Sequence, residues 1–67
     1  MEKAIRDLKA ELNGMRENVE FHQSALSSGI LSRFDYHHHS EVKKKCEARI
    51  EEIQQTLEDI DFYIGLN

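Results

Sequence analysis

The stretch IRDLKAELNGMRENVEFHQSAL, residues 5–26, decides the fold because its apolar side chains recur at alternating steps of three and four residues. This spacing places them on one stripe of an α-helix, at the a and d positions of a heptad repeat. The stripe consists of Ile5, Leu8, Leu12, Met15, Val19, His22 and Leu26. We therefore expect an amphipathic helix over residues 2–27, in which His22 is the polar member of the stripe.

A second heptad follows in the other half of the chain. Its members are Cys46, Ile50, Ile53, Leu57, Ile60 and Ile64. Phe62 and Tyr63 lie beside this stripe in the sequence, and we expect them to broaden its apolar end. The pattern predicts a second helix over residues 33–65, so that residues 1–67 form one all-α helical-hairpin domain.

The turn is expected over residues 28–32. Gly29 suits the left-handed residue that ends a helix, and Ile30 would fold back on the last turn as in a Schellman motif. Ser32 and Asp35 match the capping-box pattern of a helix start, although Ser40 is a competing start. A turn this short makes the helices antiparallel neighbours.

Folding the chain about residue 30 sets the expected pairing of the two helices. It places Leu26 beside Phe34 and His22 near His38. Farther from the turn, the same register puts Met15 near Cys46 and Ile5 near Leu57. The acidic residues that dominate positions 50–67 would then lie close to the basic side chains Lys3, Arg6 and Lys9.

The size of the chain predicts self-association. A domain of 67 residues has a marginal core, and its single cysteine cannot form an internal disulfide. Two helices can also cover one another on one side only. We therefore expect a coiled-coil-like homo-oligomer, either a dimeric four-helix bundle or a higher helical oligomer. The expected interface comprises Ile5, Leu8, Leu12, Met15, Ile53, Leu57, Ile60, Phe62, Tyr63 and Ile64.

Charge and hydropathy exclude several classes of function. The net charge of −4 argues against general nucleic-acid binding, which needs a basic surface. No apolar run approaches the ~20 residues that cross a bilayer, and the charged N-terminus does not resemble a secretory signal. We expect a cytoplasmic protein that does not bind membranes.

The chain has no sequence feature of an enzyme. It contains no phosphate-binding loop, and no zinc-finger spacing or paired catalytic carboxylates. Cys46 lies on the inward stripe, where a thiol more often packs as a small hydrophobe than acts as a nucleophile. We expect no catalytic residue and no cofactor.

The segment FDYHHHS, residues 34–40, is the most unusual part of the sequence. Consecutive helical residues point about 100° apart, so His37, His38 and His39 cannot all face one ion. No metal site is favoured, and one would need a partner across the hairpin, such as His22 with His38. His22 itself either fixes the register of the helices or acts as a pH switch.

Two short stretches resemble a family of small phage helical-hairpin proteins that sequester the cyclic nucleotide signals of bacterial antiviral defence. Residues 34–37, FDYH, resemble its Phe-x-Tyr-His element, and residues 57–63, LEDIDFY, resemble its Leu-Glu-Glu-x-x-Met-Trp element. The chain departs from the family in its shorter intervening helix, in histidines that replace prolines, and in lacking an alanine-rich closing segment. The resemblance implies a ligand contact only at Tyr36 and His37.

Three functions are compatible with these features. The first is a non-catalytic binding protein, a small phage accessory or inhibitor protein that acts on a host macromolecule. The second is an oligomer that sequesters a cyclic nucleotide or another anionic small molecule. Its candidate ligand-binding residues are Tyr36, His37, His38, Lys43, Lys44 and Lys45. The third is a structural assembly unit, with or without a linking metal ion.

Overall fold

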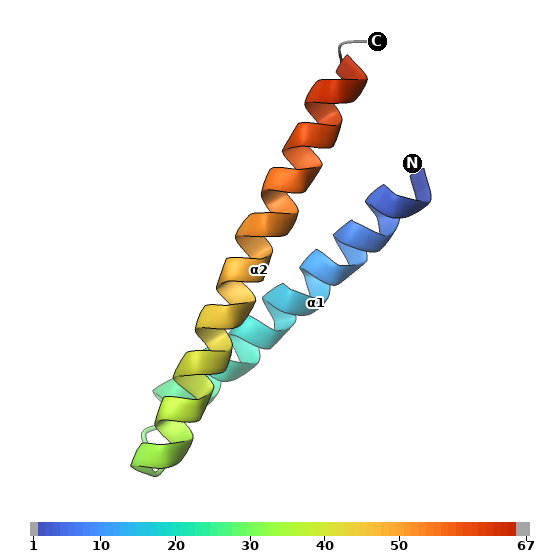
Figure 1. Cartoon of the computed structure of the whole chain (residues 1–67). Helices are drawn as coiled ribbons and strands as arrows, with labels where there is room; N and C mark the ends of the chain where they lie inside the picture. Colours follow the sequence, from blue (N-terminus) through green and yellow to red (C-terminus); the bar gives the residue numbers. More distant parts are fainter. Residues whose placement is uncertain (1, 66–67) are drawn as a thin grey trace.

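The protein is a hairpin of two α-helices in a computed structural model that describes residues 2–65 (Figure 1). Helix α1 spans Glu2–Ser27 and helix α2 spans Arg33–Gly65, and these bounds match the ranges predicted from the two heptads. Residues 2–65 contain no strand. The predicted all-helical hairpin is therefore confirmed, while the predicted oligomer stays a prediction.

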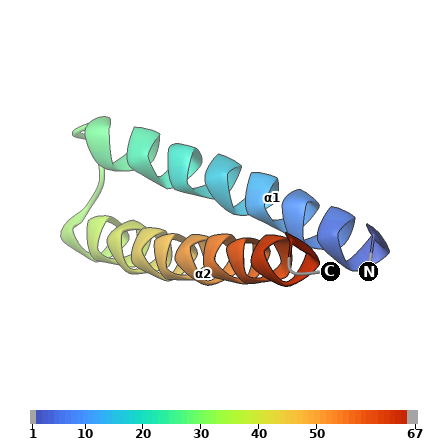
Figure 2. The ribbon, with the colours of Figure 1, turned by 90° about the horizontal axis from the view of Figure 1, so that it is seen from above.

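The two helices run antiparallel and cross obliquely. In Figure 1 their ribbons overlap near the turn and separate toward the termini, whereas in the perpendicular view of Figure 2 they separate at the turn. The result is a thin rod that measures 53 × 15 × 13 Å between Cα atoms. An oblique crossing brings the seam residues closest in the middle of the rod and leaves them less covered toward its ends.

The buried core is small. Among residues 2–65 only Leu12, Cys46 and Ile53 are buried, with 8%, 8% and 0% of their surfaces exposed. The free thiol of Cys46 lies inside this core, as the packing interpretation predicted. Ile64, at the end of the second heptad, is exposed. The other members of the two heptads are half-buried: Ile5, Leu8, Met15, Val19, His22 and Leu26 on α1, and Ile50, Leu57 and Ile60 on α2.

The end of α1 differs from the predicted Schellman motif. Gly29 has the expected left-handed conformation, with φ of 74°. However, the Ile30 N–H donates to the Ser28 hydroxyl at 3.4 Å, and the Ile30 side chain is 87% exposed. The prediction that Ile30 packs back on the helix was wrong, because the Ser28 side chain engages the amide of Ile30 just beyond the left-handed residue.

The start of α2 follows the predicted cap. The Ser32 hydroxyl accepts a hydrogen bond from the Asp35 N–H at 3.1 Å, and the Ser32 carbonyl accepts one from the Tyr36 N–H at 2.9 Å. Ser32 is therefore the N-cap residue, and the competing start at Ser40 is excluded. Phe34 follows the cap and is 80% exposed, so it contributes little to the core of the hairpin.

Two glycine substitutions should change stability in opposite directions. Gly29→Ala forces a side chain into the left-handed region and should destabilise the hairpin by about 1 kcal/mol. Gly14→Ala removes a flexible residue from the interior of α1, where an added Cβ meets nothing within 4 Å. It should stabilise the hairpin by about 0.5–1 kcal/mol. Urea unfolding followed by circular dichroism measures both, and shifts of the same sign would contradict this account of the turn.

Candidate functional site

The most specific contact between the helices joins two histidines near the turn. The Nδ1 atoms of His22 and His39 lie 2.7 Å apart, within hydrogen-bond distance. The predicted partner, His38, was wrong by one residue. A shift of one position turns a helical side chain by about 100°, which is enough to replace one histidine by the next.

Aromatic rings surround this pair. The Phe21 ring meets the His22 ring edge-on with centroids 5.2 Å apart, and it lies 6.2 Å from the His39 ring. The His38 ring lies 5.9 Å from that of His39 on the other side. We call His22, His39, Phe21 and His38 the imidazole cluster. Its two central rings are half-buried, whereas Phe21 and His38 are exposed.

The environment of the imidazole cluster disfavours a charge on His22. Burial lowers the pKa of His22 below its usual value of 6.5, and the neighbouring His39 and His38 lower it further. One Nδ1 must donate its proton and the other must accept it, so the contact is lost when both Nδ1 atoms are protonated. Asp35 and Lys43 lie one helical turn on either side of His39 along α2, and Glu41 lies two residues after it.

The predicted ligand-binding residues do not converge. Lys43 donates to the Gln23 side-chain oxygen across the hairpin, and Lys44 pairs with Glu41 on its own helix at 3.8 Å. Tyr36 and Lys45 are exposed. The part of the chain that the structure describes contains no pocket that would gather these groups around a small molecule.

A carboxylate–guanidinium clamp joins the helices nearer the middle of the rod. Arg49 donates from Nε and a terminal nitrogen to the two oxygens of Glu11, at 2.7 and 3.0 Å, and also contacts Glu52 at 3.1 Å. The hydrogen bond from Arg49 lowers the pKa of Glu11, and the bond to Glu11 raises the pKa of Arg49. This parallel pair of bonds sets the register of the helices.

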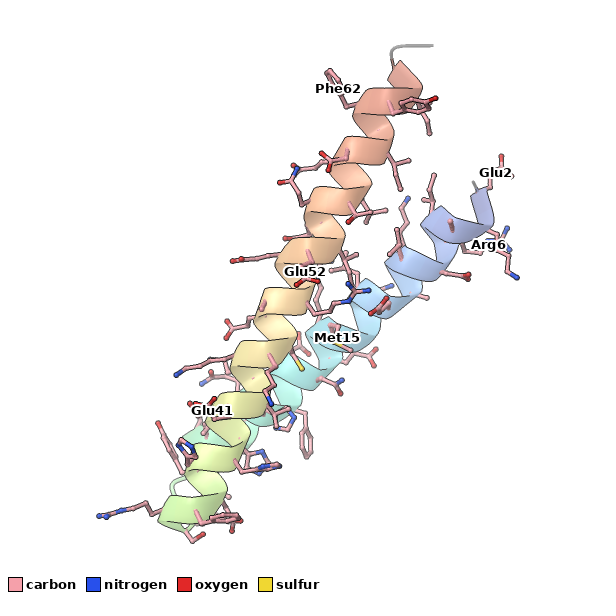
Figure 3. The ribbon with its side chains drawn as sticks, viewed as in Figure 1. Glu2, Arg6, Met15, Glu41, Glu52 and Phe62 are labelled. Atoms are coloured by element: carbon pink, nitrogen blue, oxygen red, sulfur yellow. The ribbon has the colours of Figure 1, made fainter. Side chains whose placement is uncertain are left out.

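Sequence reasoning missed this clamp and favoured a different ion pairing. Glu11 and Arg49 each flank a stripe residue, Leu12 and Ile50, as charged coiled-coil positions do, and this position was the available signal. In the described part of the chain, the predicted pairing of Lys3, Arg6 and Lys9 with the acidic end of α2 does not form. Arg6 points away from α2 in Figure 3.

The far end of α2 carries exposed apolar side chains. Ile60 is half-buried and Ile64 is 47% exposed, and both continue the seam. Phe62, by contrast, is 71% exposed and points away from α1 (Figure 3). Phe62 therefore does not broaden the hairpin's own seam as expected. Its place in an oligomer interface, like that of the exposed Tyr63, stays a prediction.

Neither helix over residues 2–65 is long and apolar enough to cross a membrane. In the same residues, no three His, Cys, Asp or Glu side chains gather closely enough to hold a metal ion. Comparisons with protein-family models, curated proteins and solved structures found no match to this chain. The resemblance to the phage hairpin family stays a prediction.

The imidazole cluster predicts that acid destabilises the hairpin. Since the pKa of His22 is lower in the folded chain than its usual 6.5, the unfolded chain binds the proton more readily. Neutral His22 therefore adds its full contribution to the free energy of unfolding above pH 6.5. This contribution decreases as the pH falls toward the lower pKa that His22 has in the folded chain. Urea unfolding between pH 7.5 and 5.5, with a chelator present, measures this loss.

Two leucine variants test the assignment to His22. His22→Leu should lose less stability between pH 7.5 and 5.5 than the natural sequence, because the half-buried titrating ring is gone. His37→Leu, which changes an exposed histidine of α2, should keep the full pH dependence. If the free energy of unfolding of His22→Leu depended on pH as strongly as that of the natural chain, the assignment of this dependence to His22 would be contradicted.

Proposed function

We propose that this protein is a non-catalytic binding protein whose working form is a homo-oligomer, most simply a dimeric four-helix bundle. The observation that supports this proposal is the small core of the single hairpin. Only three side chains are buried among residues 2–65, and nine further heptad members are half-buried. A second copy that covered the open side of the seam would bury these residues without any change in the hairpin.

The surface area of the chain supports the same proposal. A compact monomer of 7.9 kDa exposes about 4,400 Å², whereas this chain exposes 5353 Å². The excess is roughly 900 Å², close to the ~800 Å² that each partner buries in an interface of standard size. One protomer–protomer contact of ordinary dimensions would therefore bring the exposed surface to that of a compact fold.

Charge complementarity favours a second copy over an unrelated chain. Residues 50–67 carry acidic side chains and no basic one, while the start of α1 carries Lys3, Arg6 and Lys9. These three cations form no ion pair within the described part of the hairpin. The acidic end of α2 in one copy and these three cations in another would form complementary ion pairs, beside Glu2 and Asp7, which leave residues 2–9 with a net charge of +1. This self-complementarity suits a two-fold interface.

The finer hypothesis concerns what the assembly binds. We propose a phage accessory or inhibitor protein that acts on a host macromolecule. Two features support this hypothesis: the short resemblance to the phage family and the exposed apolar and aromatic side chains around the turn, Phe21, Ile30, Phe34 and Tyr36. These side chains lie at the end of the rod opposite Ile60 and Ile64, so a bundle closed at the far end would leave them accessible. Sequestration of an anionic small molecule remains the alternative, and it also requires oligomerisation, because the hairpin itself has no pocket over residues 2–65.

Introducing charge into the apolar end should dissociate the assembly. The double variant Ile60→Lys, Ile64→Lys places two ammonium groups on the proposed interface, where burying them without partners is costly. Sedimentation equilibrium at micromolar concentration should give an integral multiple of 7.9 kDa for the natural chain and 7.9 kDa for the variant.

The control is Ala48→Lys, which adds the same charge at an exposed position of α2 away from the apolar stripe. It should keep the mass of the natural assembly. A natural chain that sediments as a 7.9 kDa monomer would overturn the proposed function. A double variant that keeps the oligomeric mass would remove Ile60 and Ile64 from the interface.

A further inference from the structure

We infer that His22 and His39 form a two-imidazole clip that binds a divalent late transition metal, copper(II) or nickel(II), and links α1 to α2 beside the turn. The two Nδ1 atoms face each other from different helices, 2.7 Å apart. In the metal-free hairpin they share one proton. A metal ion would displace that proton and accept a lone pair from each ring, at a position beside the line that joins the two nitrogens.

The donors select the type of metal. Two imidazole nitrogens suit copper(II) and nickel(II), and among divalent metals copper(II) binds such donors more tightly than zinc does. Two cis nitrogens that each lie ~2.0 Å from a square-planar ion are about 2.8 Å apart, so the two Nδ1 atoms already lie close enough together to share one ion. The rings face each other in a hydrogen bond, with centroids 4.9 Å apart, and both would turn so that their lone pairs converge on the ion.

The surroundings define how complete the site is. The structure brings no third His, Cys, Asp or Glu side chain within reach in residues 2–65, so water would occupy the remaining coordination positions of a single hairpin. Phe21 packs edge-on against His22 and restricts the orientation of that ring. His38 lies beside His39 with centroids 5.9 Å apart, but its ring does not share the contact with His22. The inference therefore rests on two donors, one from each helix.

Metal binding would stabilise the hairpin by mass action. An ion that binds the folded pair more tightly than the unfolded chain raises the unfolding midpoint with its concentration. The unfolded chain keeps the run His37–His39, whose imidazoles are themselves metal ligands. The test must therefore separate the cross-helix pair from this run, and the three neighbouring histidines provide matched variants for doing so.

The experiment is thermal unfolding of the chelator-stripped full chain with nickel(II) chloride, followed by circular dichroism. Nickel should raise the midpoint in the natural chain and in the variants His37→Ala and His38→Ala. The shift should be lost in His22→Gln and His39→Gln, whose side chains keep a similar size and polarity. Sedimentation of each sample compares the oligomeric state of the variants with that of the natural chain. A lost nickel shift at unchanged mass is then assigned to the metal site, and a change in mass is assigned to the proposed self-association.

A spectroscopic measurement counts the donors directly. Electron paramagnetic resonance of the copper(II)-loaded chain with one equivalent of metal should show hyperfine coupling to two imidazole nitrogens, falling to one in His39→Gln. The inference is overturned if nickel leaves the natural midpoint unchanged, if His39→Gln keeps the shift and the two-nitrogen spectrum, or if His38→Ala loses them.

Discussion

Two packed helices can each bury only one stripe of side chains, and the rest of this structure depends on that constraint. The two heptads supply suitable stripes, yet the oblique crossing buries Leu12, Cys46 and Ile53 alone among residues 2–65. The remaining stripe residues stay half-covered along a rod 53 Å long. Neither a disulfide nor a larger core compensates, so the proposed second copy is the simplest source of further burial.

Directional contacts supply what the small core does not, a defined register. The Glu11–Arg49 clamp lies near the middle of the rod, and the His22–His39 pair lies near the turn. Both cross from α1 to α2, the clamp from positions beside the stripe residues and the histidine pair from His22 within the stripe. They also divide the molecule into two unlike ends: an aromatic, imidazole-rich end beside the turn, and an apolar, acidic end at the C-terminal part of α2. The proposed metal binding and pH response belong to the first end, and the proposed self-association belongs to the second.

The sequence was sufficient to predict the elements and insufficient to predict individual contacts. Heptad spacing, Gly29 and the Ser32 cap locate both helices, because periodicity and capping are local properties. The partner of His22 and the orientation of Phe62 depend on helix rotation, for which one residue means about 100°. The Glu11–Arg49 clamp and the exposed Ile30 depend on how particular side chains satisfy nearby groups, and heptad spacing carries no information about that choice.

The dependence of the unfolding midpoint on protein concentration tests the central claim most directly. If folding and association are coupled, the midpoint must rise with protein concentration, since dilution favours dissociated chains with their marginal cores. Calorimetry or circular dichroism over a hundredfold range of concentration, with a chelator present, measures this dependence. We predict a midpoint that climbs steadily across the range. A single cooperative transition at the same temperature throughout would contradict the account and show that the hairpin is stable alone.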